Sequence, residues 1–290
     1  MMQKLRYLAL ASAAAWAVTG CKRVSAQNEV VEGENAAVAA AANTAGGDVS
    51  SSVNAPMPKE ADALSALGRM STYLRTLKNF EVKATVTTET VLDDGSKMTT
   101  AQRVEAVASR PNKLRIQLSS DRKKRLFVYD GKTFTMFAPR QNVFAVVDAP
   151  NTIQALATML EDKYDIELPL VDLVRWGAAG SAADGVSGAR DVGPAEIDGV
   201  TCEQYIFRND GLDWQVWIQQ GEYPLPRKLV LTTLTDEARP QHTAIYEWNL
   251  APSFDESAFA FVAPAGAKKI TVAEARAVRA AEQKQGGTSQ

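Results

Sequence analysis

The sequence predicts an α+β domain in which a large, strongly curved antiparallel sheet packs against a few helices. Residues 200–231 contain three runs rich in Val, Ile, Phe, Tyr and Trp, and the two segments between them have the residues of hairpin turns. Similar runs elsewhere raise the total to about ten strands, nearly all joined by short turns. Strands joined in this way are antiparallel, and a sheet of this size curls. Helical patterns are confined to the start and the middle of the domain, which is typical of an α+β fold.

The N-terminus has the three regions of an export signal. Lys4 and Arg6 precede an apolar run over residues 7–18, and small residues follow it. The run is too short to predict a transmembrane helix. We therefore expect residues 1–20 to be a signal peptide.

The small residues before Cys21 resemble the lipobox of bacterial lipoproteins, in which cleavage leaves the cysteine first and a diacylglyceryl group is attached to its sulfur. This resemblance implies that Cys21 is a lipid anchor, and Lys22 resembles the sorting residue of lipoproteins sent to the outer membrane. The alternative is cleavage after Val24-Ser25-Ala26, which would remove Cys21 and leave a soluble periplasmic protein.

Residues 21–58 are rich in Ala, Asn, Gly, Ser and Glu and contain no aromatic residue. A segment of this composition cannot bury an apolar face, so we expect a flexible tether. The domain itself should extend over residues 59–270. A C-terminal helix or tail is expected over residues 271–290, where helix-forming residues are common but large apolar ones are few.

The first half of the domain is expected to begin with a helix and to continue as a series of strands. Residues 59–78 have apolar residues at spacings of three and four, which predicts an amphipathic helix lying across the sheet. Alternating runs then predict strands at residues 80–87, 98–109, 114–118, 125–129, 134–137 and 143–147.

The second half is expected to begin with helices and to end with strands. Residues 151–164 have helical spacing and can be capped by Asn151 or Thr152, and residues 168–176 predict a further helical piece. The Gly-, Ala- and Ser-rich residues 177–193 predict a mobile loop. Strands follow at residues 200–207, 213–219, 227–231 and 242–248.

Composition and motifs give little support for chemistry. The chain has 32 basic and 34 acidic residues, so it lacks the basic surface of a nucleic-acid-binding protein. His242 is the only histidine, which excludes a two-histidine metal site, and neither a G-x-S-x-G elbow nor a phosphate-binding loop occurs. Catalysis by two carboxylates stays open, but nothing favours it. We expect no catalytic residue, no metal site and no cofactor.

Two reactive-looking features have simpler explanations. Cys202 lies in a strand pattern without a second cysteine or a cation nearby, so we expect a buried, inert thiol. The charged residues 121–125 fall between two strands, where a solvated turn is expected. Binding of phosphate or anionic lipid by this cluster is the alternative.

The strand alternation places apolar side chains on one face of the sheet. A curled sheet with an apolar concave face makes a cavity for a hydrophobic ligand, unless the helices fill that face completely. Because side chains alternate, Trp214 and Trp217 should point to opposite faces, and we expect Trp214 to point inward. The predicted lining residues are Trp214, Val216, Ile218, Leu229, Leu231, Leu114, Ile116 and Leu118 from the sheet, with Leu67, Met70 and Leu74 from the first helix.

A set of short motifs carries a family resemblance over residues 61–270. They are Asp198-Gly199-Val200-x-Cys202, Asp213-Trp214-Gln215-x-Trp217-Ile218, Pro224-Leu225-Pro226-Arg227-Lys228-Leu229, Trp248-Asn249-Leu250-Ala251-Pro252 and Phe259-x-Phe261-x-x-Pro264-x-Gly266-Ala267. Together they resemble an uncharacterised family of predicted periplasmic bacterial proteins, a branch of the lipoprotein-localisation-factor (Lol carrier) superfamily. The resemblance implies a half-barrel that wraps around helices, an apolar cavity that accepts acyl chains in the carriers, and no catalytic residues.

We therefore expect a non-enzymatic lipoprotein of the bacterial envelope that faces the periplasm and is anchored in the outer membrane. Its expected ligand is a lipid, an acyl chain or a lipidated partner held in the apolar cavity. The alternative is a regulatory or scaffold protein of the envelope that binds a protein partner through the same fold.

Overall fold

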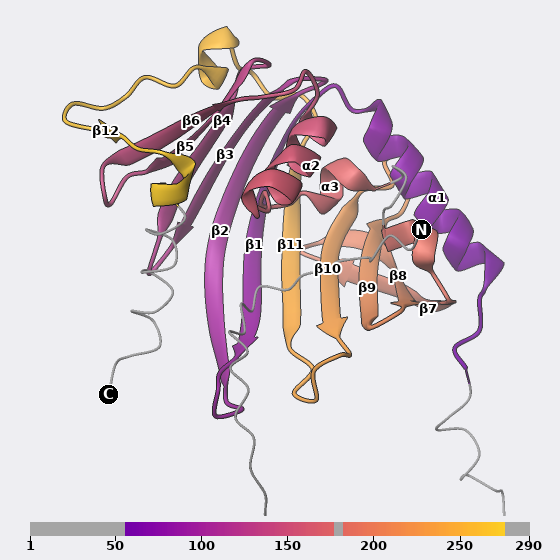
Figure 1. Cartoon of the computed structure of the whole chain (residues 1–290). Coiled ribbons are helices and arrows are strands. Elements are labelled where there is room, and N and C mark those ends of the chain that lie inside the picture. The colour runs from indigo at the N-terminus through magenta and orange to yellow at the C-terminus, as the bar shows by residue number, and fades with distance from the viewer. Residues whose placement is uncertain (1–55, 177–181, 276–290) are drawn as a thin grey trace, which may run out of the picture. The chain divides into compact units, whose positions relative to one another are not determined.

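The computed structural model describes residues 56–176 and 182–275 (Figure 1). The predicted signal peptide, Cys21 and nearly all of the predicted tether lie outside the described residues, and so does the tail beyond Ala275. Within the described ranges, no helix combines the length and the apolar character needed to cross a membrane.

The fold is built on one 12-stranded sheet with the order β12-β6-β5-β4-β3-β2-β1-β11-β10-β9-β8-β7. The sheet is curved but open, because β7 and β12 form its two edges (Figure 1). The predicted α+β half-barrel and all the predicted strands are confirmed. The strands are β1 (Asn79–Val91), β2 (Lys97–Ser109), β3 (Lys113–Ser120), β4 (Lys124–Tyr129), β5 (Thr133–Ala138), β6 (Val143–Asp148), β7 (Gly188–Ile197), β8 (Val200–Asn209), β9 (Leu212–Gln219), β10 (Pro226–Thr233), β11 (Gln241–Asn249) and β12 (Lys268–Lys269).

Two antiparallel meanders meet at the pair of β1 and β11. The first meander runs from β1 to β6 and the second from β7 to β11. In the joining pair, Val82 lies opposite Trp248 and Ala84 opposite Tyr246. Residues far apart in the sequence thereby share one continuous face.

The helices lie on the concave side of the sheet (Figure 1). Helix α1 (Ala61–Thr76) buries Ala63, Leu67, Met70 and Leu74, which are spaced three and four residues apart, as predicted. Helix α2 (Ile153–Tyr164) begins where Thr152 Oγ1 accepts a hydrogen bond from the Ala155 amide, so one of the two predicted caps is correct. Helix α3 (Asp172–Arg175) is a single turn and is shorter than predicted.

The prediction of a loop over residues 177–193 was wrong from Gly188 onward. Residues 188–197 form the edge strand β7, preceded by a short 3-10 helix at Ala182–Gly185. The strand was not predicted because Gly193 and Pro194 disfavour a central strand. On an edge they are tolerated, and the register of β7 with β8 shifts between Asp191 and Gly193.

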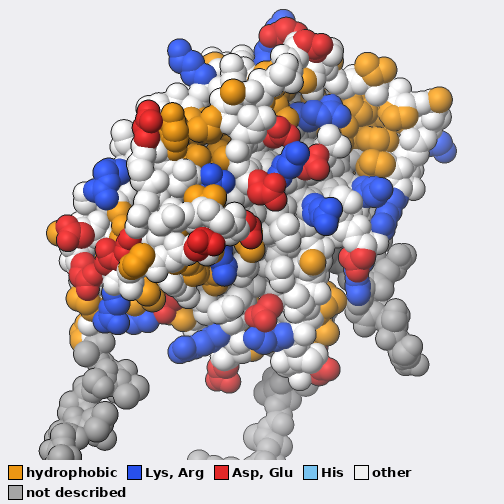
Figure 2. All heavy atoms as spheres, turned by 180° about the vertical axis from the view of Figure 1, so that it is seen from behind, with side chains coloured by type: hydrophobic (Ala, Val, Ile, Leu, Met, Phe, Trp, Pro, Cys, Tyr) orange, Lys and Arg blue, Asp and Glu red, His pale blue; other side chains and the backbone are white. Residues whose placement is uncertain are grey.

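A C-terminal segment crosses the convex face and adds a strand that was not predicted. The ring of Phe261 lies 5.6 Å from that of Phe137 and 5.3 Å from that of Phe144, measured between centroids. Strand β12 then pairs with β6 in parallel, whereas the other neighbouring strands are antiparallel. The convex face, seen in Figure 2, carries acidic and basic side chains interspersed with hydrophobic ones.

Candidate functional site

The concave face gathers the residues that were predicted to line a cavity. Those from β3, β9, β10 and α1 all belong to one hydrophobic cluster. The cross-strand register explains this, because Trp214 lies opposite Leu231 and Val216 opposite Leu229. The exposed fractions of Trp214, Val216, Ile218, Leu229, Leu231, Leu114, Ile116, Leu118, Leu67, Met70 and Leu74 are between 0% and 8%.

Trp214 points into this cluster, as predicted, and Trp217 points to the convex face. There Trp217 belongs to a second cluster with Cys202 and Val230. The Cys202 side chain is fully buried, and burial raises the pKa of its thiol, as expected for an inert cysteine. The register between β9 and β10 shifts only between Pro226 and Lys228, away from Trp214.

Two hollows in the described structure lie away from the predicted lining residues. One of about 610 Å³ lies along α2, beside Thr152, Ala155 and Met159. The other, of about 290 Å³, lies on the convex face, where Phe144 and Phe261 contribute to its wall. The predicted lining residues are instead buried in the core, as the alternative of a filled concave face expects. A ligand could reach them only if the elements covering them moved.

A few polar contacts connect α3 to its surroundings. Arg110 Nη2 donates to the carbonyl of Leu173 at 3.4 Å, while the buried Arg110 Nε has no hydrogen-bond partner among the described residues. Glu161 on α2 forms an ion pair with Arg175 on α3. Burial raises the pKa of Asp172, and the positive charge of Arg175 only partly offsets this effect. Sequence reasoning missed this cluster, because its members come from separate segments.

The concave face changes character toward the hairpin turns that end β1, β2, β10 and β11. Figure 1 shows these strand ends extending past α2 and α3. Apolar residues continue there on the β10 side with Leu231, but Thr88 on β1 lies opposite both Thr100 on β2 and His242 on β11. We call Thr88, Thr100, Gln102 and His242 the polar end of the concave face.

His242 is held inside this polar end rather than at the surface. Its Nδ1 lies 2.9 Å from Thr88 Oγ1, and the residue is half-buried. Burial lowers the pKa of His242, so its ring is uncharged at neutral pH. No group of three His, Cys, Asp or Glu side chains within the described ranges is arranged to hold a metal ion.

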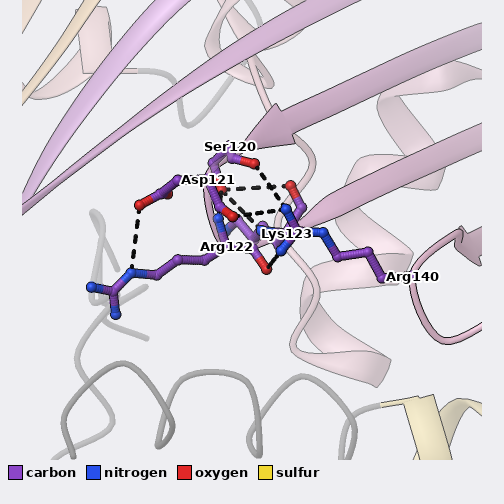
Figure 3. A network of polar contacts seen from close by, with 5 residues as sticks. All are labelled: Ser120, Asp121, Arg122, Lys123 and Arg140. Atoms are coloured by element: carbon purple, nitrogen blue, oxygen red, sulfur yellow. Dashed lines mark hydrogen bonds and ion pairs between the residues drawn. The ribbon is translucent and has the colours of Figure 1, made fainter. Parts of the chain in front are cut away.

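Residues 121–123 of the charged cluster form the predicted turn between β3 and β4, whose polar contacts are shown in Figure 3, while Lys124 and Arg125 begin β4. Ser120 Oγ accepts hydrogen bonds from the amides of Arg122 and Lys123. Arg140, from the turn between β5 and β6, donates to the carbonyl of Asp121 at 2.7 Å. These contacts shape the turn, in keeping with its interpretation as a solvated turn.

Several solved structures are similar to this chain. LprF from Mycobacterium bovis is 14% identical with a TM-score of 0.42, and the match covers 68% of this chain and 97% of that chain. The lipoprotein LppX from Mycobacterium tuberculosis is 13% identical with a TM-score of 0.35, over 68% of this chain and 100% of that chain. The LolA superfamily protein NE2245 from Nitrosomonas europaea is 10% identical with a TM-score of 0.35, and the match covers 69% of this chain and 97% of that chain. Likenesses at these TM-scores support no statement about ligand or partner.

The family is established by sequence. No curated protein matches the chain closely enough to count as a relative. The model of a family described as "Predicted periplasmic protein (DUF2092)" matches residues 63–273, which include the whole sheet, α2, α3 and all but the first two residues of α1. The chain therefore belongs to the DUF2092 family of predicted periplasmic proteins.

Proposed function

We propose that this protein binds a lipid or another ligand with an acyl chain on the concave face of its sheet, without catalysing a reaction. The observation that carries the proposal is the extent of the apolar face. Its cluster continues along β1, β10 and β11 through Val86, Ala244 and Leu231, toward strand ends that α2 and α3 do not reach (Figure 1). An acyl chain laid along such a face gains about 0.8 kcal/mol for each CH₂ group that it buries.

The attachment of the helices is compatible with ligand entry. Two hydrogen bonds connect α2 and α3 to the segment between β2 and β3: Arg110 donates to the Leu173 carbonyl, and the Ile153 amide donates to the Pro111 carbonyl. Asp172 on α3 also interacts electrostatically with the buried Tyr246 on β11. The apolar residues of α2 and α3 pack in the concave cluster, and a hydrophobic ligand can replace such contacts with contacts of the same kind. When the ligand enters, the apolar side chains of the sheet would exchange their contacts with the helices for contacts with the ligand.

The proposed location is the periplasmic side of the bacterial envelope, with Cys21 as the lipid anchor in the outer membrane. The family description supports the periplasmic part of this proposal. The lipobox-like residues before Cys21 support the anchor. A tether over residues 21–58 would let the domain reach ligands near the membrane.

The test is a titration of the purified protein with 1-N-phenylnaphthylamine, whose fluorescence rises in apolar sites, together with lipid extraction and native mass spectrometry. We expect saturable binding of the probe, displacement by palmitoyl compounds, and co-purifying lipid. Leu231→Gln should weaken binding of the probe, because Leu231 belongs to the concave cluster. Val230→Gln is the matched control, since Val230 is also 8% exposed but faces the convex cluster.

The proposal is contradicted if neither probe nor lipid binds, or if the two variants weaken binding equally. A stoichiometric protein partner that co-purifies without lipid would instead favour the regulatory or scaffold function. Thermal unfolding of both variants shows whether a loss of binding reflects a loss of folding.

A further inference from the structure

The polar end interrupts an otherwise apolar concave face. One cross-strand row reads Thr100, Thr88, His242, Leu231 and Trp214 from β2 to β9, as the register of these strands shows. Its β9 and β10 members belong to the hydrophobic cluster, whereas its β1, β2 and β11 members are polar. The row therefore places hydrogen-bonding groups directly beside an apolar surface, as an amphipathic ligand requires.

The polar groups of this row are only partly satisfied. The hydrogen bond between Thr88 and His242 uses Nδ1 of the ring. In the neutral ring Nε2 is the second polar atom, and no hydrogen bond from it to another described residue is found. On the neighbouring row, Gln102 lies opposite Val86, and its Oε1 is buried without a hydrogen-bond partner among the described residues. An unpaired buried polar atom is costly, so a ligand that pairs with it is favoured.

The charges of these strand ends lie on the opposite face. Glu89 and Lys97 pair at 3.0 Å, and Glu89 also accepts a hydrogen bond from the Gln241 amide. Both side chains alternate with Thr88, Thr90 and Met98, so they point to the convex side. The concave-facing residues of β1, β2, β10 and β11 at this end include none of Lys, Arg, Asp or Glu: they are Thr88, Thr90, Met98, Thr100, Gln102, Leu231, Thr233 and His242.

We propose that the polar end binds an uncharged, hydrogen-bonding head group of an acyl ligand, such as an ester, an amide or a hydroxyl, while the chain lies on the adjoining apolar face. This inference rests on the proposed function and deepens it. A carboxylate or phosphate head would lie here without an opposing charge, which disfavours its burial. A neutral head can instead bond to His242 and to the threonine hydroxyls.

The chemistry of such a head is shared by free acylglycerols and by acyl groups attached to a protein. The test therefore compares three ligands as competitors of 1-N-phenylnaphthylamine on the full chain: 1-monopalmitoylglycerol, an amidated N-palmitoyl peptide and palmitate. We expect both neutral ligands to bind at least about 5-fold more tightly than palmitate, at equal chain length. If only one of the two neutral ligands binds more tightly than palmitate, the site selects that class of ligand, either a free acylglycerol or an acylated protein segment.

Two variants test which residues give this preference. Thr88→Val keeps the shape of the side chain and removes its hydroxyl, and His242→Leu removes the ring nitrogens. Each should weaken binding of 1-monopalmitoylglycerol about 3- to 10-fold and leave that of palmitate and the fluorescent probe nearly unchanged. Thr87→Val is the matched control, because Thr87 is the next residue on β1 and points to the convex face.

The outcomes separate this inference from the proposed function. If all three ligands displace the probe equally and the variants change nothing, the head-group site is refuted and the apolar site stands. If no ligand and no probe binds, both are refuted. Because Thr88→Val preserves shape, and because the preference of the unaltered protein is measured independently, a misfolded His242→Leu variant does not prevent a decision.

Discussion

Trp214 and Trp217 lie three residues apart on strand β9, yet they stabilise two different hydrophobic clusters on opposite faces of the sheet. Trp214 is 1% exposed, its ring lies 4.4 Å from that of Phe207, and its Nε1 donates to Asn209 Oδ1 at 2.7 Å. Trp217 is 9% exposed on the convex face, with Lys228 Nζ 4.6 Å from its ring centroid. The surroundings of the two rings differ in burial and in polarity. Replacing Trp214 and replacing Trp217 should therefore lower the free energy of unfolding by different amounts.

Trp214→Phe is expected to lower the free energy of unfolding by about 2–4 kcal/mol, because it removes both buried volume and a buried hydrogen bond. Trp217→Phe should cost about 1 kcal/mol, because the ring is at the rim of a small cluster and its cation–π contact is weak. Urea unfolding of the two variants measures both changes. Equal losses would contradict this assignment of faces.

The opposite orientation of these tryptophans could be predicted from sequence because period-two alternation is a local property. The same holds for the other strands that were predicted, in which β-branched and aromatic residues alternate with polar ones. The spacing of Leu67, Met70 and Leu74 likewise defined the buried face of α1. In each case the residues that determine the outcome are close together in the chain.

The polar end and β7 could not be predicted because they depend on distant residues. Thr88 and His242 are 154 residues apart, and only the pairing of β1 with β11 brings them together. Thr88 lies on the same face of β1 as Val86. The change from an apolar to a polar residue on that face was the one sign in the sequence that the apolar surface ends there. Strand β7 is stabilised by its pairing with β8 rather than by the propensity of its own Gly and Pro residues.

Asp172 is expected to destabilise the protein when it is ionised. Burial raises the pKa of its carboxyl group in the folded state. A carboxyl group whose pKa is raised in the folded state stabilises the fold fully below the unfolded pKa of 3.8. This stabilisation is lost as the pH rises through the folded pKa. Asp172→Asn should therefore stabilise the protein at neutral pH by on the order of 1 kcal/mol, with a smaller gain near pH 4.

Thermal unfolding of the Asp172→Asn variant at several pH values checks this expectation. Asp162→Asn on α2 is the matched control, because Asp162 is exposed and the substitution is the same. A stabilisation that does not depend on pH, or one that Asp162→Asn also produces, would show that the buried charge is not the cause.

His242 should make stability depend on pH in the opposite direction. Its pKa is lowered from 6.5 by burial, so the unfolded chain binds a proton at a higher pH than the folded protein does. The contribution of His242 is thus present above the unfolded pKa and is lost as the pH falls through the folded value.

This dependence can be isolated because the chain has a single histidine. As the pH falls from about 7 to 5, the unfolding midpoint of the unaltered protein should fall relative to that of a His242→Gln variant, which cannot gain the proton. Asp172 contributes equally to both proteins, so the difference between them reports on His242. Parallel pH profiles for the two proteins would refute a buried, uncharged His242.

Gly188 should be required at the start of β7 because the N-terminal segment of the domain lies against it. A Cβ atom at this position would be 2.8 Å from Cβ of Met57. The same segment is paired with β7 through the Ala189 amide, which donates to Pro58 at 2.8 Å, and the Glu60 amide, which donates to Ala189 at 3.0 Å. Gly188→Ala would push these backbones apart and should lower the free energy of unfolding by about 1–3 kcal/mol.

The control is the same substitution in a helix, at a position with free space. A Cβ atom on Gly68 of α1 meets nothing within 4 Å, so Gly68→Ala should raise stability by up to about 1 kcal/mol through helix propensity. Met57→Gly should restore much of the stability that Gly188→Ala removes, because it takes away the atoms that clash. If the two alanine variants change stability in the same direction, or if Met57→Gly restores nothing, the close contact does not determine the choice of glycine at the start of β7.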